Sequence, residues 1–516
     1  MAPLTDTPVE LLFKIAADLD AIDVFRLSQA CKLLHEMASQ HQVWATALRG
    51  TCRSSQIFEP TYPIDSMELP HLRRAALAPW RPVNILPGPE IRPGSALRND
   101  TILPQIISGH CVAMVLRVHL IPGGRYLIEL VRRCFQIWDL GVPWTLENDL
   151  SSPVVICTQN ADTGLAFNDI SKPVRSGTDT LRMIAHGVPP SVSLGDNDSA
   201  SFLQIYEIGP LPKDCRIRLL AKHRVGDLVI PKPMRYWLSG DRVYFVCDDT
   251  HVLVWDYIRS LYASWNLVPS SLTWEGEAGE LKQCTSVGDI FIVWTETRVV
   301  ALNIPQLCDM NPSLSLSELS RHPVNPPPTL NSTFRYPSDT PRTRGHDRTS
   351  PSFASHVLIP SIWYQLQGSS LIFDLVIRPR LDSENIKLTR LHCDVSRPRA
   401  MLQIIQNKTI PRFSEGTAYL PLSYELSLNH AVVIFLPDRD HNFYASPYPI
   451  ILTTPPLDMK DADKTQFDAS VTRIKTRLFW RRGPDICPTS GRAAYVCDLM
   501  VSKHPDCAHS IHVGYP

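Results

Sequence analysis

An internal repeat in the middle of the chain is the feature that most constrains the fold. Three segments align without a gap: GGRYLIELVRRCFQIWDL (Gly123–Leu140), GDRVYFVCDDTHVLVWDY (Gly240–Tyr257) and VGDIFIVWTETRVVALNI (Val287–Ile304). In each segment a Gly or Asp opens an apolar run, a polar turn interrupts it, and a second apolar run ends on Asp or Asn. Short apolar runs bounded by turn residues predict β-strands joined as hairpins.

The spacing of these hairpins suits the blades of a β-propeller. The second and third copies start at residues 240 and 287, a spacing of 47 residues, close to the roughly 40–50 residues of one blade. A weaker fourth copy combines TLRMIAHG with SFLQIYEI (Ser201–Ile208) after an insertion. Trp138-Asp139 and Trp255-Asp256 resemble the WD signature at the end of a blade's third strand. We therefore predict a diverged, WD40-like β-propeller; the alternative is a set of ordinary antiparallel hairpins in another all-β fold.

The second half of the chain continues the strand pattern after an interruption. Residues 305–356 are rich in Pro, Ser, Thr, Asn and Arg and poor in large apolar residues. Such a composition cannot bury enough apolar surface to offset its ordering entropy, so we predict a disordered insertion within the propeller. Strand-like runs then resume as SLIFDLVI, AMLQIIQ, AVVIFLP, YPIILTT and AAYVCDLMV.

The N-terminal stretch has a helical pattern instead. TPVELLFKIAADLDAIDVFRLSQACKLLHEMASQHQVW (Thr7–Trp44) opens with Thr7 and Glu10 in the arrangement of a capping box, which predicts a helix start. A second helix is expected from about Ala21 to Lys32, and a third short one follows. The unit closes on Trp44.

These helices carry more apolar surface than a small unit can hide. Apolar residues on the first helix recur at spacings of one, three and four residues, which gives a wide stripe. A unit of about 45 residues seldom stabilises itself without a metal, disulfides or a partner. Either the rest of the chain covers the stripes as the main domain's first helical layer, or another protein covers them.

The order and spacing of these residues resemble the F-box family. The resemblance covers about a tenth of the 516 residues. One position departs from the family pattern, because Thr7 stands where the family has Leu before the Pro. The residues that carry the resemblance are Pro8, Glu10, Leu11, Leu12, Ile15, Leu19, Asp23, Val24, Leu27, Cys31, Lys32, Leu33 and Trp44.

The resemblance implies a partner and a role. In the F-box family this three-helix module docks on a Skp-type adaptor of a cullin-RING ubiquitin ligase, and the rest of the chain captures the protein substrate. By this resemblance the adaptor-binding residues are Pro8, Leu11, Leu12, Ile15, Leu19, Val24, Leu27 and Trp44. The target itself has no signature in the sequence.

The predicted fold is an α+β multidomain chain. Residues 1–48 form the small three-helix F-box module, and residues 106–516 form the mainly-β, propeller-like substrate-binding domain. Residues 49–105, which contain LPHLRRAALAPWRP, form a helical and Pro-rich connector anchored by Leu77 and Trp80.

Charge and cysteine use narrow the class of partner and the compartment. Lys plus Arg and Asp plus Glu number 51 each, so no net field attracts nucleic acid or an anionic membrane surface, and we expect neither as a partner. No secretory signal or membrane-length apolar run is recognisable. Thirteen cysteines without CxxC spacing suit reduced thiols. A cytoplasmic or nuclear protein is expected.

No catalytic, cofactor or metal signature supports an enzyme. The phosphate-binding GxxxxGK[ST], the dinucleotide GxGxxG, the GxSxG elbow and the HExxH motif are all missing. We expect Asp139 and Asp256 to fix turns. The C-terminal thiols and imidazoles lack the spacing of common zinc sites; they are Cys487, Cys497, His504, Cys507, His509 and His512.

The sequence thus favours a non-catalytic substrate receptor of an SCF-type (Skp, cullin, F-box) ubiquitin ligase. The first alternative is an interaction scaffold that uses F-box-like helices outside a ligase, and Thr7 is the residue that favours it. The second is an enzyme of propeller type, which needs acidic or His residues gathered at the central channel.

Overall fold

The structure is a computed structural model of the chain. Its strands and helices are joined by segments whose structure is left undescribed. The described residues are 7–80, 98–102, 115–131, 133–143, 153–189, 200–227, 235–247, 251–267, 281–295, 298–321, 325, 330–335, 355–358, 370–377, 385–394, 401–411, 419–426, 431–437, 450–454, 470–473, 485–487, 492–498 and 509–515.

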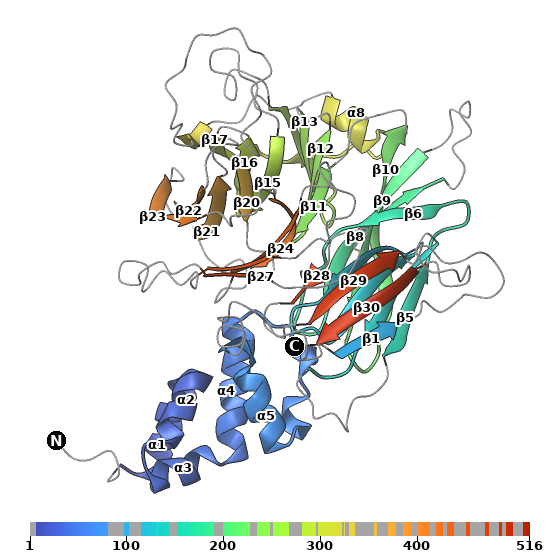
Figure 1. Ribbon diagram of the computed structural model, residues 1–516. Helices are drawn as coiled ribbons and strands as arrows, with labels where there is room; N and C mark the ends of the chain where they lie inside the picture. Colours follow the sequence, from blue (N-terminus) through green and yellow to red (C-terminus); the bar gives the residue numbers. More distant parts are fainter. Residues whose placement is uncertain are drawn as a thin grey trace.

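Residues 7–80 form a helical unit at one end of the molecule (Figure 1). Three 3₁₀ turns, η2 (Glu59–Thr61), η3 (Ile64–Ser66) and η4 (Ala78–Trp80), connect or follow its helices. The helices are α1 (Val9–Asp18), α2 (Ala21–Ser28), α3 (Lys32–Ala38), α4 (His41–Ser54) and α5 (Leu69–Ala76).

Helix α4 lies at the centre of the helical unit. One continuous apolar core runs from Leu12 to Ala76 and includes Trp44 and Leu48 of α4. Hydrogen bonds fasten the later residues to α4: the Thr51 hydroxyl donates to the carbonyl of Ala76 at 3.2 Å. The predicted boundary at residue 48 therefore falls inside a helix. It is corrected here, because the helical part of the predicted connector belongs to the same core.

The helix boundaries differ in detail from the prediction. Helix α1 begins at Val9 with Pro8 at the N-cap, and no side chain caps it. The capping box of Thr7 and Glu10 is therefore absent. The predicted second helix ends at Ser28, four residues before Lys32, because a break at residues 29–31 separates α2 from α3.

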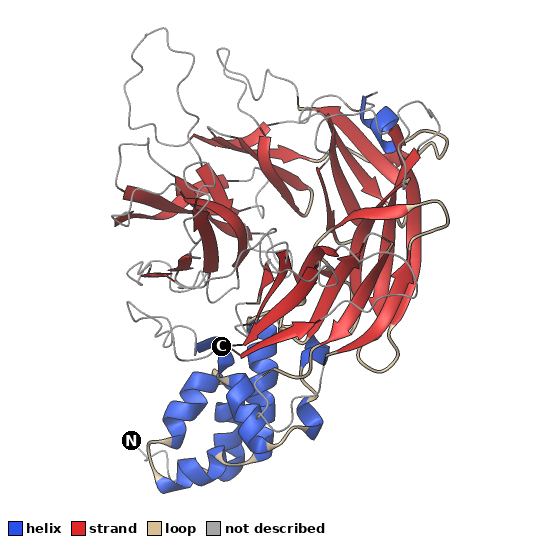
Figure 2. Cartoon of the chain, turned by 45° about the vertical axis from the view of Figure 1, so that its right-hand side comes forward, coloured by secondary structure: helices blue, strands red, loops and turns tan. Residues whose placement is uncertain are grey.

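The β domain consists of seven sheets among the described residues, and Figure 2 shows its strands beside the helical unit. The first four sheets are called blades 1 to 4. Blade 1 contains β2 (Val115–Leu120), β3 (Tyr126–Val131), β4 (Cys134–Asp139) and β5 (Val154–Asn160); blade 2 contains β6 (Ala166–Ile170), β7 (Val174–Arg175), β8 (Leu181–Val188), β9 (Ala200–Gly209) and β10 (Arg216–Asp227). Blade 3 contains β11 (Arg235–Ser239), β12 (Arg242–Cys247), β13 (His251–Asp256), β14 (Leu261–Asn266) and β18 (Cys308–Asp309); blade 4 contains β15 (Leu281–Val287), β16 (Ile290–Thr295), β17 (Arg298–Asn303) and β19 (Leu330–Arg335).

The strand-like runs predicted after the insertion form the remaining sheets. Blade 5 contains β20 (Ser355–Leu358), β21 (Ser370–Ile377), β22 (Asn385–Asp394) and β23 (Met401–Pro411). Blade 6 contains β24 (Tyr419–Leu426), β25 (Ala431–Pro437), β26 (Ile450–Thr454) and β27 (Ser470–Arg473). Blade 7 contains β28 (Asp485–Ile486), β29 (Ala493–Asp498), β30 (His509–Tyr515) and β1 (Arg98–Ile102).

Blade 7 closes the ring of sheets. Strand β1 pairs antiparallel with β30, from Arg98 opposite Tyr515 to Ile102 opposite Ile511. One apolar core also joins blade 7 to blade 1, with Ala494 packed near Trp138. Pairing of the first strand with the last sheet is how a propeller avoids exposed ends. The propeller prediction is confirmed, and its start moves from residue 106 to β1.

The four predicted hairpins are the second and third strands of blades 1 to 4. They form the pairs β3 with β4, β8 with β9, β12 with β13, and β16 with β17. On β3, Ile128 faces the core shared with blade 2 and Leu127 faces the core shared with blade 7. Because both faces of a blade are buried, these strands carry continuous apolar runs rather than an alternating pattern.

The predicted disordered insertion begins with ordered structure, which corrects the prediction. Strand β18 adds to β14 of blade 3, and helix α8 (Leu316–Arg321) packs on blades 2 and 3 with Leu316 and Leu319 buried. A reciprocal capping box starts α8: Ser315 N donates to Glu318 at 2.7 Å and Glu318 N donates to Ser315 at 3.3 Å. The prediction of disorder rested on overall composition, and it missed this helix because its closely spaced leucines stand among serines. Residues 336–354 lie outside the described residues.

Candidate protein-interaction site

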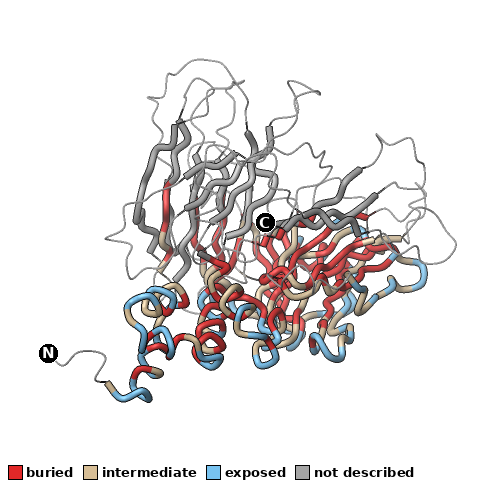
Figure 3. Tube along the Cα trace, turned by 60° about the horizontal axis from the view of Figure 1, so that its bottom comes forward, coloured by how far each residue is buried: buried red, intermediate tan, exposed pale blue. Residues whose placement is uncertain are grey.

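The helical unit exposes an apolar surface. Eight large apolar side chains are exposed among the described residues, and five of them lie on α1, α2 and α3. Figure 3 shows the buried residues of this unit where its helices meet and exposed residues along the outside. We call these five the apolar surface; they are Val9 (46% exposed), Leu11 (48%), Ile15 (41%), Phe25 (40%) and Leu33 (39%).

Adjacent apolar pairs create this surface. Successive residues of an α-helix are rotated by about 100°, so two neighbours cannot both face one small core. In α1 Leu12 is buried and Leu11 is exposed. In α2 Val24 is buried and Phe25 is exposed, and in α3 Leu34 is buried while Leu33 is exposed.

The predicted adaptor-binding residues divide by burial. Pro8, Leu11 and Ile15 are exposed, and Leu11 and Ile15 share one face of α1 because they are four residues apart. Leu19 and Leu27 are partly buried against the core of the helical unit. Five predicted residues therefore keep some surface available to a partner.

The prediction of direct adaptor contacts is corrected for Leu12, Val24 and Trp44. Their side chains are 2%, 0% and 1% exposed, so they form the core of the helical unit and offer almost no surface to a partner, although Trp44 also lines the groove described below. The Trp44 indole N–H donates to the carbonyl of Ala38 at 2.6 Å, and the Arg73 guanidinium lies 5.4 Å from the ring centroid. Their role is to hold the helices in place.

The sequence-based prediction missed three exposed residues. Val9, Phe25 and Leu33 were not among the predicted contacts, although each is apolar and exposed. The signal that identifies Phe25 and Leu33 is the adjacent apolar pair, because only one member of a pair fits a core of this size.

A groove of about 560 Å³ adjoins the apolar surface. It shares Phe25 with that surface, and its lining carries four basic residues and no acidic one among the lining residues described. This combination suits a partner segment with apolar and acidic side chains. The lining residues are Phe25, Ser28, Gln29, His35, Trp44, Leu69, Pro70, His71, Arg73, Arg74 and Leu77.

Residues 57–62 join the helical unit to the propeller, and we call this contact the junction. Ile57 belongs to the core of the helical unit, whereas the next residue, Phe58, belongs to the core shared by blades 1 and 2. The amide of Phe58 donates to the carbonyl of Pro122 at 3.0 Å. Two adjacent residues in two cores fix the orientation of one unit on the other.

Gly123 makes the close approach at the junction possible. Its φ is +105°, and a Cβ at this position would lie 2.4 Å from the hydroxyl oxygen of Thr61 and 2.8 Å from a methyl group of Ile57. A residue with a side chain therefore cannot occupy the turn without moving the junction.

The WD-type aspartate of blade 1 supports the junction. The Arg125 guanidinium makes hydrogen bonds of 2.8–3.1 Å to the carboxylate of Asp139 and donates to the carbonyl of Pro60 at 3.0 Å. Burial acts to lower the pKa of Arg125, and its bonds to Asp139 outweigh burial and raise it. In blade 3, Asp256 accepts from the amide of Arg259 in a turn. The prediction that these aspartates fix turns is confirmed.

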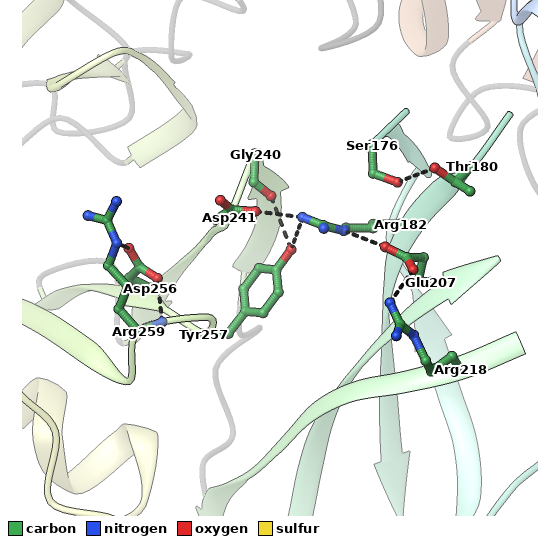
Figure 4. Close-up of polar contacts among 10 residues, drawn as sticks. All are labelled: Ser176, Thr180, Arg182, Glu207, Arg218, Gly240, Asp241, Asp256, Tyr257 and Arg259. Atoms are coloured by element: carbon green, nitrogen blue, oxygen red, sulfur yellow. Dashed lines mark hydrogen bonds and ion pairs between the residues drawn. The ribbon is translucent and has the colours of Figure 1, made fainter. Parts of the chain in front are cut away.

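Ion pairs join the following blades on the face that carries the junction. Arg182 of blade 2 lies 2.6 Å from Asp241 of blade 3 and donates to the hydroxyl of Tyr257 at 2.9 Å (Figure 4). Arg242 of blade 3 reaches Asp289 of blade 4 at 2.7 Å. These contacts hold neighbouring blades in a fixed relation.

Metal-ligating side chains do not gather in the described part of the chain. No group of three His, Cys, Asp or Glu side chains there is placed to hold a metal. Of the C-terminal thiols and imidazoles, Cys487 is buried and accepts from the amide of Gly123 at 3.1 Å; the placement of the other five side chains lies outside the description. No helix among the described residues has the length and apolarity to span a membrane.

Comparison with known proteins agrees with this architecture. Residues 5–49 match the family model described as F-box-like. Similar solved structures include the WD40 domain of SCAP from fission yeast (11% identity, 78% of this chain and 82% of that chain, TM-score 0.37). The N-terminal domain of Nup159 (10%, 81% and 94%, 0.33) and Kluyveromyces lactis Hsv2 (10%, 70% and 98%, 0.28) are also similar. No curated protein sequence matched the chain.

The chain therefore carries an F-box-like domain followed by a domain of the WD40-like β-propeller type. The seven described sheets of the chain define the propeller. The F-box-like domain and the apolar surface on it support a role in protein–protein interaction.

Proposed function

We propose that the protein is the substrate-recognition subunit of an SCF-type ubiquitin ligase. In this role the helical unit binds a Skp-type adaptor, and through it a cullin, while the propeller binds the target protein. The observation that carries the proposal is the gathering of five exposed large apolar side chains on the three helices that match the F-box-like family.

The adaptor docks on the apolar surface. Leu11 and Ile15 supply adjacent apolar contacts from α1. Phe25 leads into the groove, where Arg74 and His35 meet acidic side chains of the adaptor. A standard protein contact buries about 800 Å² per partner, so the apolar surface forms its centre and the basic groove its rim.

The target binds the propeller face that lies away from the helical unit. The junction occupies the turn between the first and second strands of blade 1, at one end of the blade's strands. Loops of a rigid scaffold are common binding sites because they vary without disturbing the core. The chain itself supplies no catalysis: it positions the target's lysines for a conjugating enzyme of the ligase.

This role places the protein in the cytoplasm or the nucleus. Ten cysteines in the described part of the chain are free thiols, which suits a reducing compartment. The chain needs no cofactor for this role, and its partners are the adaptor, the cullin bound to it, and a protein target.

Co-purification tests the proposal. The full chain is expressed with a Skp-type adaptor and its cullin, beside the double variant Leu11→Asp with Ile15→Asp. Both side chains are exposed, so the variant keeps its core while placing two charges in the contact. A stoichiometric complex with the wild type, and loss of at least about tenfold in affinity for the variant, is expected.

The matched control is Leu219→Asp. Leu219 lies on β10 of blade 2 and is 44% exposed, close to the 48% of Leu11. This variant should bind the adaptor as the wild type does. The proposal is wrong if neither the wild type nor the control binds the adaptor, or if all three proteins bind equally.

A second candidate function is an interaction scaffold outside a ligase. Thr7 favours it, because the F-box family has an apolar Leu at this position and Thr7 is partly buried here. Replacing Thr7 with Leu distinguishes the two functions. If the wild type binds the adaptor poorly and Thr7→Leu restores binding severalfold, the scaffold function is favoured.

A further inference from the structure

Two cysteines lie near each other where the outer strands of blades 1 and 2 meet. Cys157 lies in the middle of β5, the fourth strand of blade 1, and Cys215 immediately precedes β10, the outermost strand of blade 2. They are 58 residues apart in the sequence, and the Cys157 thiol donates to the backbone carbonyl of Cys215 at 3.4 Å. Both side chains are half-buried at the edge of the core that the two blades share.

We propose that Cys157 and Cys215 form a reversible disulfide that links blade 1 to blade 2 when a hydroperoxide oxidises them. The geometry carries the proposal, because the Cys157 sulfur lies 3.4 Å from the backbone carbonyl of Cys215, and the two residues belong to neighbouring blades that share one core. Partial exposure lets a small oxidant reach the sulfur.

The surroundings give the two thiols different roles. The neighbouring Cys215 side chain lowers the pKa of Cys157, against the opposing effect of burial. The proximity of Cys157, together with burial, raises the pKa of Cys215. Cys157 is therefore the thiolate that reacts first, and Cys215 is the thiol that resolves the product.

The reaction proceeds in two balanced steps. The Cys157 thiolate attacks one oxygen of hydrogen peroxide, the O–O bond breaks, and the products are a sulfenic acid on Cys157 and hydroxide, which takes a proton to become water. The Cys215 sulfur then attacks the Cys157 sulfur as its proton leaves. The S–O bond breaks, a second water departs, and the S–S bond forms. The two sulfurs lose two electrons in total, and the peroxide gains them.

The disulfide would act on the platform that carries the helical unit. The junction contacts both blades, because Phe58 packs in their shared core and Glu59 lies 3.0 Å from Arg175 of blade 2. A covalent link across a loop of this length restricts the unfolded chain and stabilises the folded one. Oxidation therefore tightens the seam on which the junction sits.

The test uses the purified full chain. It is reduced, freed of reductant, treated with about one equivalent of hydrogen peroxide, alkylated and digested without reduction for mass spectrometry. The expected product is one cross-linked peptide pair that contains Cys157 and Cys215, and thiol reductant should remove it. The melting temperature should rise by several degrees Celsius on oxidation and return on reduction.

Two variants sharpen the test. In Cys215→Ser, dimedone should trap the sulfenic acid on Cys157, and peroxide should no longer raise the melting temperature. Cys308→Ser is the control, because Cys308 is also half-buried and its thiol also donates to a backbone carbonyl, that of Tyr262 at 3.2 Å. It should behave as the wild type does.

Three outcomes would overturn the proposal. The first is stable sulfenic or sulfinic acid on Cys157 of the wild type without the cross-linked peptide. The second is oxidation of Cys308 at peroxide levels that leave Cys157 reduced. The third is a cross-link without any change in melting temperature. If Cys215→Ser does not fold, the results for the wild type alone test the proposal.

Discussion

The helical unit and the propeller bury their apolar residues in different ways. Blades 1 to 3 are covered on both faces by neighbouring blades, and among the described residues of blades 1 to 4 three large apolar side chains are exposed: Val154, Leu219 and Ile258. The helical unit has one core, and five large apolar side chains remain outside it. A blade in a ring always has a neighbour, whereas a small helical unit at the end of a chain has an open side.

This difference shows where a partner is needed. Among their described residues, blades 1 to 4 leave few large apolar side chains exposed. The helical unit leaves large apolar residues on α1, α2 and α3 exposed, and exposed apolar side chains on three successive helices are candidates for contact with a partner. The two regions therefore differ in the apolar surface that they leave for a partner.

The largest expected effect compares two neighbouring leucines of α1. Leu12→Ala removes a side chain that is 2% exposed and should cost about 2–5 kcal/mol in the helical unit. Leu11→Ala removes one that is 48% exposed and should change stability by less than about 0.5 kcal/mol. Hydrogen exchange of the α4 amides measures the loss of stability in each of the two variants. Equal losses would contradict the division into core and partner surface.

A buried glutamate in the propeller makes the stability of this region depend on pH. Glu129 of blade 1 is fully buried, its carboxylate accepts from the Trp138 indole at 2.7 Å, and burial raises its pKa to about 7. The folded state therefore holds this proton more tightly than the unfolded chain does. Its contribution to stability is fully present below about pH 4.5 and is lost as the pH rises through about 7.

Urea unfolding at pH 5 and pH 8 measures the effect of Glu129. The wild type should lose up to about 3 kcal/mol relative to Glu129→Gln between these values, because the amide does not titrate. The comparison with the variant removes the effects of other groups, such as the buried His186, whose pKa burial lowers. Parallel pH profiles for the two proteins would show that Glu129 is not buried as described.

Gly123→Ala tests the junction between the two regions. The positive φ and the clash with Thr61 should together cost about 2 kcal/mol and loosen residues 57–62. Gly240→Ala is the matched control, because Gly240 also has a positive φ but no atom within 4 Å of its Cβ position. It should cost about 1 kcal/mol. Limited proteolysis should cut the junction faster only in Gly123→Ala, and equal cutting would mean that the two units are not tightly joined.

The smallest effect compares two arginines on the junction face. Arg242→Gln breaks a pair with Asp289, whose side chain is 80% exposed, and should cost less than about 0.5 kcal/mol. Arg125→Gln breaks a pair that is 13% and 20% exposed and also loses the bond to Pro60, so about 1–2 kcal/mol is expected. Thermal unfolding of both variants shows which substitution lowers the stability more. A larger effect at Arg242 would mean that the ring depends on its blade-to-blade ion pairs more than on the junction.

Much of the propeller could be predicted because its strands carry local signals. The hairpins at Gly123–Leu140 and Gly240–Tyr257 combine apolar runs with turn residues inside a single segment. Closure by β1 could not be predicted, because its partner β30 lies more than 400 residues away, and a five-residue strand with four polar or charged residues gives no pairing signal. Helix α8 was missed because a short leucine spacing lay within a polar stretch.

The candidate site was predicted as a region and only partly residue by residue. The pattern located α1, α2 and α3, yet it could not say which member of Leu11 and Leu12 faces inward. That choice depends on α4 and α5, and the sequence assigned most of their residues to a connector. Burial of Trp44 follows from the same contacts.

Hydrogen exchange of the full chain with and without a Skp-type adaptor tests the central claim most directly. The account predicts strong protection of α1, α2 and α3 on binding, with blades 1 to 4 unchanged, since the partner covers the apolar surface and the propeller already covers its own. Leu11→Asp with Ile15→Asp should abolish that protection. Protection confined to the propeller, or an unchanged exchange pattern at saturating adaptor, would contradict the account.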